Sequence, residues 1–498
     1  MDAIDKLKQD VREGRIGAEV LIDLIADLCR KLEAAQKRVE ELEKELGRRP
    51  TAKLDEPFST RAEEQRQEAR GKKKRQHKPK GRRGRLSTDD KVAQAERTEP
   101  VFPEGVPPDA CYLSHVRPVW RLESGRAVLV AYQVYRGPGN RYGQIPGVLG
   151  RSEYGLEIVT EIAYLVYIVG LSFDKVCLLL NFFQNLRLGK SQANALLYRL
   201  SRDWEHEFDL LCTLLANSLV VHADETSWSL NSVWAFLSEK ARVLLFGVHK
   251  DAATLKKVLD PASFAGIVIS DDAAVYANFT ESQKCWAHLL RKAIKLTLQD
   301  PNNTEYRGFT DRLLEIYREA CRVQRDKRLS DEGRARKVRV LEAEIVELCE
   351  GMWLADLPPM EGLENDYRLL VDELMRIMLR EELFTFVTAK PTTQPNGMTK
   401  PVDGTNNEAE RTLRGAAQAR VTGRTNKTVN GARRQTILTS VLESLRLYLP
   451  TFTLSSVLEE LKRWWATGQS CFEKLVEKLK LTPPEQSVID QILPGPSG

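Results

Sequence analysis

Between Leu219 and about residue 298 the hydrophobic pattern changes from a helical period to short β-rich runs, and this stretch constrains the fold most strongly. Three runs predict a strand meander, followed by a crossover helix, a fourth strand, and a short strand entering a helix: "LVVHADE", "SVWAFLSE", "RVLLFGVH", "AATLKKVL", "FAGIVISDD" and "KCWAHLLRKAIKL". This order predicts a mixed α/β sheet and favours pairing of the first and fourth strands. Asp224 and Asp271 lie at the ends of those two strands, so we expect their carboxylates to meet.

Helical periodicity dominates on both sides of this sheet. Residues 146–215 contain two short helices, "LSFDKVCLLLNFF" and "SQANALLYRLSRDW", whose separation by a tight turn is typical of a helix-turn-helix. Gln192, Asn194 and Arg199 on the second helix could contact base edges, and ordinary helix packing explains them equally well. Residues 301–388 repeat apolar positions at steps of three and four, which predicts an all-α insertion.

The N-terminal part of the chain combines an apolar seam with a basic run. Apolar residues from Leu21 to Leu46 alternate steps of four and three, so residues 1–48 are predicted to form a coiled coil that joins subunits. A helix packed on its own domain is the alternative. Residues 49–100 are predicted to be a flexible basic linker, and residues 101–145 a β-hairpin segment with its turn at Glu123–Gly125.

Positive charge is concentrated in the linker. The run 70–85 holds ten Lys and Arg residues and no acid, whereas the net charge of the whole 498-residue chain is only +5. Such a run can neutralise DNA phosphates without reading sequence, and a solubilising linker is the alternative. The candidate phosphate contacts are Lys72, Lys73, Lys74, Arg75, Arg82 and Arg83.

Composition excludes several classes of protein. A hydrophobic content of 42% suits a globular, multidomain protein, and no apolar stretch approaches the roughly 20 residues of a membrane helix. The charged N-terminus has no signal-peptide pattern, so we expect a cytoplasmic protein without a membrane partner. Eight scattered cysteines without a CxxC pair argue against a disulfide scaffold or a zinc ribbon.

Three acids at element ends have the chemistry of a metal site. Transfer of a phosphodiester is accelerated by two divalent ions about 3.5–4 Å apart, and hard ions such as Mg²⁺ prefer carboxylate oxygens. Asp224 and Asp271 follow strands, and Glu410 lies on the later helix "NEAERTLRGAAQAR". Because the chain has 70 acidic residues, their spacing alone would not select this triple.

The sequence motifs around these acids do select this triple. "HADET", "SDDAAVY", "CWAHLLRK" and "NNEAERTLR", in this order, resemble the signature blocks of the insertion sequence 66 family of DDE transposases, over about residues 145–465. The resemblance implies a multidomain α/β plus α protein, with a ribonuclease-H-like core (216–300 and 389–450), the all-α insertion (301–388) and C-terminal helices (451–498). It also implies that Asp224, Asp271 and Glu410 are the catalytic acids, holding two Mg²⁺ or Mn²⁺ ions.

Departures from the family pattern leave two alternatives open. Asp272 stands where the family usually has glycine, so either Asp271 or Asp272 could be the second ligand. Glu408 rivals Glu410, but residues two apart on a helix point to different faces, and the position after the paired asparagines favours Glu410. Of the cysteine-rich segment of many relatives only Cys111 remains, so we expect no zinc there.

Further residues near the acids are candidate DNA contacts. Cys285 and His288 form a C-x-x-H pair, which offers only two ligands, so we expect no zinc here either. His288 is predicted to be structural or to contact DNA, with a buried helix histidine as the alternative. Two further sets of basic residues could contact DNA phosphates. The first set follows Glu410, and an exposed basic helix face is its alternative interpretation: Arg411, Arg414, Arg420, Arg424 and Lys427. The second set is Arg291 and Lys292, which follow His288.

The resemblance implies a transposase that cleaves DNA at the ends of an insertion element and joins the 3′-hydroxyl ends to target DNA. Its partners would be double-stranded DNA, further subunits in a dimer or larger assembly, and, as in some family members, small accessory proteins. It would be bacterial and associated with the nucleoid when bound to DNA. A metal-dependent nuclease without strand transfer, and a non-catalytic DNA-binding protein that keeps the fold, are the alternatives.

Overall fold

The computed structural model describes residues 86–353 and 361–495. The predicted coiled coil, most of the predicted linker and the basic run lie outside the described residues, together with Lys72, Lys73, Lys74, Arg75, Arg82 and Arg83. Within the described ranges, no helix combines the length and the apolar character needed to cross a membrane.

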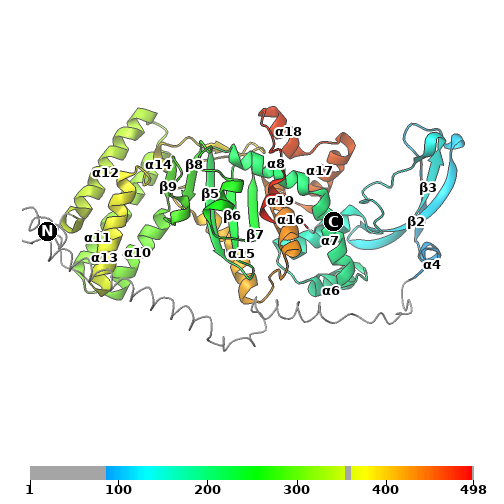
Figure 1. Ribbon diagram of the computed structural model, residues 1–498, viewed down its shortest axis with the longest axis horizontal. Coiled ribbons are helices and arrows are strands. Elements are labelled where there is room, and N and C mark those ends of the chain that lie inside the picture. The colour runs from blue at the N-terminus through cyan, green and yellow to red at the C-terminus, as the bar shows by residue number, and fades with distance from the viewer. Residues whose placement is uncertain (1–85, 354–360, 496–498) are drawn as a thin grey trace, which may run out of the picture. The chain divides into compact units, whose positions relative to one another are not determined.

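A five-stranded mixed sheet, in the order β7-β6-β5-β8-β9, forms the centre of the described chain (Figure 1). Its strands are β5 Val220–Ser227, β6 Ser232–Ser238, β7 Arg242–Val248, β8 Ile267–Ser270 and β9 Ser282–Lys284. β5, β6 and β7 pair antiparallel, whereas β8 is parallel to β5 and β9 is parallel to β8. The first and fourth strands are therefore neighbours, as the sequence predicts, and the mixed α/β arrangement is consistent with a ribonuclease-H-like core.

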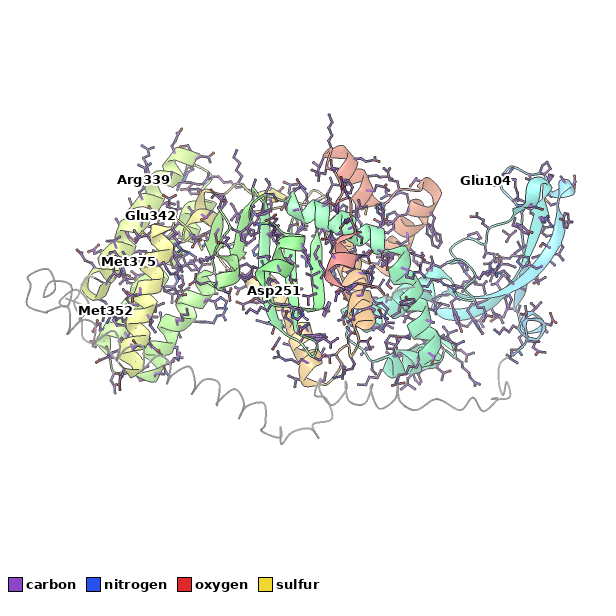
Figure 2. All side chains as sticks on the ribbon, viewed as in Figure 1. Glu104, Asp251, Arg339, Glu342, Met352 and Met375 are labelled. Atoms are coloured by element: carbon purple, nitrogen blue, oxygen red, sulfur yellow. The ribbon has the colours of Figure 1, made fainter. Side chains whose placement is uncertain are left out.

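Helix α9 (Ala252–Val258) connects β7 to β8. It begins after Asp251, which Figure 2 labels. The Asp251 side chain accepts a hydrogen bond from the backbone N–H of Thr254 at 2.7 Å. This cap satisfies one of the free donors at the start of the helix. Leu255 and Val258 are buried, so the helix covers apolar surface while it carries the chain across to β8.

The outer edge of the sheet is closed by side-chain hydroxyls of helix α16 (Val429–Tyr448). Positions four apart on a helix are about 6 Å apart along its axis, close to the 6.6–6.8 Å between alternate residues of a strand. Three hydroxyls of α16 use this match to accept hydrogen bonds at 2.9–3.0 Å from outward-facing N–H groups of β7: Thr436 from Phe246, Ser440 from Leu244 and Ser444 from Arg242. The edge strand thus leaves no row of open donors facing the helix.

The described part of the predicted all-α insertion, residues 301–388, contains three long helices and a short one: α11 Thr304–Arg325, α12 Asp331–Trp353, α13 Gly362–Leu379 and α14 Thr385–Thr388. Helix α10 (Trp286–Gln299), which precedes the insertion, packs against α11 and α13. Met375 of α13, labelled in Figure 2, is buried among these helices. The same apolar cluster includes Val220 of β5 and Ile269 of β8, so the insertion shares a core with the strands that carry the acids.

Residues before the core form a smaller sheet and a helical region. The hairpin β2 (Tyr112–Glu123) and β3 (Arg126–Gly137) turns at Ser124 and Gly125, both with positive φ, and pairs with the short strand β4 (Arg141–Tyr142). The prediction of a flexible linker over residues 49–100 differs from the structure at its end, because α4 (Thr88–Ala93) and all but the last residue of β1 (Arg97–Val101) lie within it. β1 pairs with β3, although the charged, proline-containing sequence "RTEPV" does not predict a strand.

The remaining elements precede the central sheet or follow the insertion. Those before the core are α5 Leu156–Ala163, α6 Phe173–Gln184, α7 Lys190–Asp203 and α8 Glu205–Ala216. The segment 388–406 has loop composition and holds only the two-residue strands β10 Thr392–Thr393 and β11 Thr399–Lys400. It leads to α15 Asn407–Val421, which packs on β5 and β6, and the C-terminal helices are α17 Leu454–Thr467, α18 Cys471–Lys478 and α19 Val488–Ile492.

Candidate active site

The register of two neighbouring strands brings Asp224 and Asp271 together. In the parallel pair of β5 and β8, Val220 pairs with Ile267 and His222 with Ile269, an offset of 47 residues that also separates Asp224 from Asp271. Asp271 is the first residue after β8, so the two acids occupy equivalent positions on adjacent strands, which lie about 4.8 Å apart. A backbone N–H holds one oxygen of each carboxylate, from Glu225 at 2.9 Å and from Ala273 at 3.1 Å.

Glu410 reaches this region through the start of α15. The buried side chain of Asn406 donates to the carbonyl oxygen of Ala223 at 2.8 Å, directly before Asp224. The backbone N–H of Asn406 points to the sulfur of Cys285 at 3.1 Å. The N–H of Glu410 donates to the Asn406 carbonyl at 3.1 Å, so the third acid lies one helical turn from this anchor.

The pKa of Asp224 reflects its burial and the acids near it. Burial, followed by the neighbouring charges of Glu225, Asp271 and Glu410, raises the pKa of Asp224 to about 7. One of these charges is already balanced, because the buried Glu225 carboxylate accepts from the Tyr276 hydroxyl and pairs with Lys250 at 2.5 Å. Excess negative charge remains around Asp224, and carboxylate oxygens are the donor set that hard divalent cations prefer. The residues therefore fit a divalent metal.

The third carboxylate is paired with a basic side chain. Glu410 Oε1 lies 2.6 Å from Arg291 Nη2 and 3.7 Å from His288 Nδ1. Among residues 86–353 and 361–495, the one group of three or more His, Cys, Asp and Glu side chains with ligand atoms within 4.8 Å of one another is Cys285, His288 and Glu410. Asp224, Asp271 and Glu410 thus share a region without forming a closed ligand set.

The two rival acids have other partners. Asp272 forms an ion pair with Arg376 of the insertion helix α13. Glu408 pairs with Arg242 of β7 at 2.7 Å, and this arginine also lies 3.7 Å from Glu443. The ion pair of Asp272 favours Asp271 as the second acid. Glu408 and Glu410 each pair with an arginine, and Glu410 is favoured because its charge is among those that raise the pKa of Asp224.

The candidate base contacts of the helix-turn-helix region each have a partner within the chain. Such contacts are typical of residues that fix the packing of α7 against its neighbours, so they favour the packing alternative. Gln192 donates to the Tyr154 hydroxyl at 3.3 Å, Asn194 accepts from Arg434 at 2.7 Å, and Arg199 donates to the Leu149 carbonyl at 3.3 Å.

The candidate phosphate contacts near the acids fall into two groups. Arg411 and Arg414 are exposed on α15. The others lie against protein groups: Arg420 donates to Ser227, Arg424 donates to the Gly170 carbonyl at 3.2 Å, Lys427 is half-buried, Arg291 pairs with Glu410, and Lys292 pairs with Glu373.

Sequence reasoning assigned no role to Glu225, Lys250 or Tyr276. Glu225 is adjacent to Asp224 in the block "HADET", and Tyr276 belongs to the block "SDDAAVY", so both lie within the blocks that resemble the family. Their contact with each other, across 51 residues, exists only in the fold. Lys250 has no sequence signal beyond its charge.

A mixed sheet with acids at equivalent ends of adjacent parallel strands, and a third acid on a helix packed against them, defines a protein of the DDE polynucleotidyl transferase class. The sequence matches the model of the Transposase IS66 family over residues 151–434, more than half of the chain. The chain belongs to this family and is a DDE transposase, a DNA-binding polynucleotidyl transferase. A comparison with curated proteins found no match.

Proposed function

We propose that Asp224, Asp271 and Glu410 are the catalytic acids, and that they hold two Mg²⁺ or Mn²⁺ ions while the enzyme cuts element ends and joins their 3′-hydroxyls to target DNA. The observation that carries this proposal is the shared register of Asp224 and Asp271 on β5 and β8. The raised pKa of Asp224 supports it, because crowded carboxylates beside one buried acid suit a cation.

The protein's own groups have defined tasks in this proposal. Asp224 gives up its proton when the site is loaded, and the N–H groups of Glu225 and Ala273 keep Asp224 and Asp271 oriented. Glu410 leaves Arg291 and turns toward the other two acids. Cations bound there would stabilise charge on the attacking and leaving oxygens of the phosphodiester and lower the pKa of a bound water.

Positive charge outside the acids would bind the DNA backbone. We propose that the basic run 70–85, together with the exposed Arg411 and Arg414, supplies this sequence-independent affinity, and that the predicted coiled coil pairs two subunits so that two element ends are held together. Deleting residues 70–85 should weaken DNA binding and reduce the slope of log binding constant against log salt concentration. An unchanged slope would show that this run is only a linker.

A strand-transfer assay with a labelled element end, target DNA and Mg²⁺ or Mn²⁺ tests the catalytic assignment. The parental protein should form joined products, whereas Asp224→Ala, Asp271→Ala and Glu410→Ala should abolish joining and retain DNA binding. Asp272→Asn and Glu408→Gln are matched controls, since each alters an acid of the same motif that pairs with an arginine. Parental joining rates in the three alanine variants would overturn the assignment.

The same assay separates the two alternative functions. A nuclease without strand transfer would release cut ends but attach none to the target. A non-catalytic DNA-binding protein would do neither and would bind DNA equally well with or without the three acids. The intact acids and their clustering around Asp224 favour chemistry over binding alone.

A further inference from the structure

The C-x-x-H pair acquires a third ligand in the folded protein. Cys285 is the residue before α10, and His288 follows within the first turn of the same helix. Glu410 comes from α15, more than a hundred residues later in the chain. The thiol, an imidazole nitrogen and a carboxylate oxygen lie within 4.8 Å of one another. The expectation of no zinc was based on two ligands, and the fold supplies another.

The distances suit a tetrahedral ion. Zinc bonds of about 2.0–2.3 Å to nitrogen, oxygen and sulfur place neighbouring ligands of a tetrahedron about 3.3–3.8 Å apart. His288 Nδ1 and Glu410 Oε1 are 3.7 Å apart, too far for a hydrogen bond and close to this spacing. In the described part of the chain, His288 Nδ1 is buried and has no hydrogen-bond partner. A buried nitrogen in this state is costly unless something else binds it.

A backbone donor points at the sulfur of Cys285, whose burial raises the pKa of the thiol, so a bound cation would have to displace the thiol proton. Cys285 is buried, and the backbone N–H of Asn406 points at its sulfur from 3.1 Å. Donors of this kind stabilise sulfur ligands and orient them toward a metal. The group that must move is Arg291, whose guanidinium contacts Glu410 from an exposed position on α10. Release of an exposed ion pair costs little.

We propose that Cys285, His288 and Glu410 form a binding site for a borderline-soft divalent cation, Zn²⁺, with a water molecule as the fourth ligand. A thiolate and an imidazole select zinc over Mg²⁺, which prefers oxygen ligands. The site shares Glu410 with the proposed catalytic set, so zinc holds this acid away from Asp224 and Asp271. The binding site stands on its own geometry, whereas this inhibitory consequence rests on the proposed function.

Cobalt(II) can report the thiolate directly, because it takes zinc sites and gives a thiolate-to-metal charge-transfer band in the near ultraviolet. Metal-free full-length protein titrated with Co²⁺ should develop this band at one equivalent per chain, and Zn²⁺ should bleach it. Cys285→Ser should remove the band. His288→Gln and Glu410→Gln should each weaken zinc affinity by more than about 100-fold, since loss of outer-shell partners alone costs 10–100-fold.

Cys321→Ser is the matched control, because it changes a half-buried cysteine of α11 outside the cluster. It should keep the band and the zinc affinity. If Cys285→Ser fails to fold, as circular dichroism would show, His288→Gln decides the question, because its side chain is 35% exposed and tolerates a polar replacement. Absence of the band, or a band that survives both Cys285→Ser and His288→Gln, overturns the site.

Strand transfer then tests the sharing of Glu410. Micromolar Zn²⁺ added to the Mg²⁺-dependent reaction should inhibit the parental protein and the Cys321→Ser variant. His288→Gln, compared with its own zinc-free activity, should need at least tenfold more zinc for the same inhibition. A cobalt band without any strand transfer would refute the proposed function and leave the zinc site standing. Strand transfer without a cobalt band would do the reverse.

Discussion

The side-chain amide of Asn406 donates a hydrogen bond to the carbonyl oxygen of Ala223 at 2.8 Å, across 183 residues of sequence. This contact joins the start of α15 to β5 at the residue before Asp224. It sets the position of Glu410, which follows one helical turn later. The helical insertion separates the two partners in the chain, yet its length leaves this contact untouched because β5 and α15 pack directly on each other.

Asn406→Ala should therefore impair catalysis more than DNA binding. The change removes the amide donor and leaves the buried Ala223 carbonyl without this partner, at a cost of about 1–3 kcal/mol in folding stability. Strand-transfer rate and thermal unfolding should both fall, whereas DNA affinity in a gel-shift assay should stay near the parental value. Asn407→Ala, at the exposed neighbouring position, is the control. Equal behaviour of the two variants would contradict a positioning role for Asn406.

The ion pair between Arg291 and Glu410 makes a second prediction. If this pair holds the third acid away from its partners, Arg291→Gln should lower the Mg²⁺ concentration that gives half-maximal strand transfer. Arg291 is 54% exposed, so the pair is worth at most about 1 kcal/mol and the shift should not exceed about fivefold. A phosphate contact for Arg291 predicts a different result, namely weaker DNA binding with an unchanged Mg²⁺ requirement. Titrations of both ligands distinguish the two roles.

The sheet could be predicted from the sequence because its order follows from local patterns. The β-rich runs "LVVHADE" and "FAGIVISDD" and the crossover helix between them favour pairing of β5 with β8, and each acid lies four residues after the start of its strand in the observed register. These signals lie within the segment itself. They require no knowledge of what packs against the sheet.

Other features depend on partners that are distant in sequence. The choice between Asp271 and Asp272 is informed by Arg376, which the insertion helix α13 brings to Asp272. Gln192 and Asn194 have the side chains of base-reading residues, and only the fold shows their contacts with Tyr154 and Arg434. Glu410 likewise joins Cys285 and His288 through tertiary structure. Residue type limits what each side chain can bind, and the fold selects among those possibilities.

The hydroxyl contacts between α16 and β7 predict opposite effects at two adjacent residues. Ser440 accepts from the buried N–H of Leu244, so Ser440→Ala should leave this donor unpaired and destabilise the protein by about 1–3 kcal/mol. Thr439 is also buried, but its hydroxyl has no partner among the described residues. Thr439→Val keeps the shape and removes an unpaired polar group, so its thermal midpoint should be unchanged or higher. A similar loss in both variants would contradict the edge-capping role.

The raised pKa of Asp224 predicts how stability depends on pH when divalent metal is absent. The folded protein binds this proton up to about pH 7, whereas the unfolded chain releases it near the ordinary value of 3.8. The free energy of unfolding should therefore fall by at most about 4 kcal/mol as pH rises from about 4 to 7. Above pH 7 this group should cause no further change. Asp224→Asn cannot ionise, so it should melt at a higher temperature than the parental protein at pH 8 and at a similar temperature at pH 4.

Divalent metal should produce the same gain in the parental protein at pH 8, because a cation bound at the acids compensates the charge that burial penalises. In Asp224→Asn, Mg²⁺ should raise the melting temperature much less, since one ligand is lost and its charge is already absent. Thermal scans in chelator and in Mg²⁺, at pH 4 and pH 8, measure all these differences on the two proteins. If the parental protein and Asp224→Asn keep a constant difference in melting temperature across this pH range, Asp224 is ionised in the metal-free fold and the carboxylates around it do not interact as described.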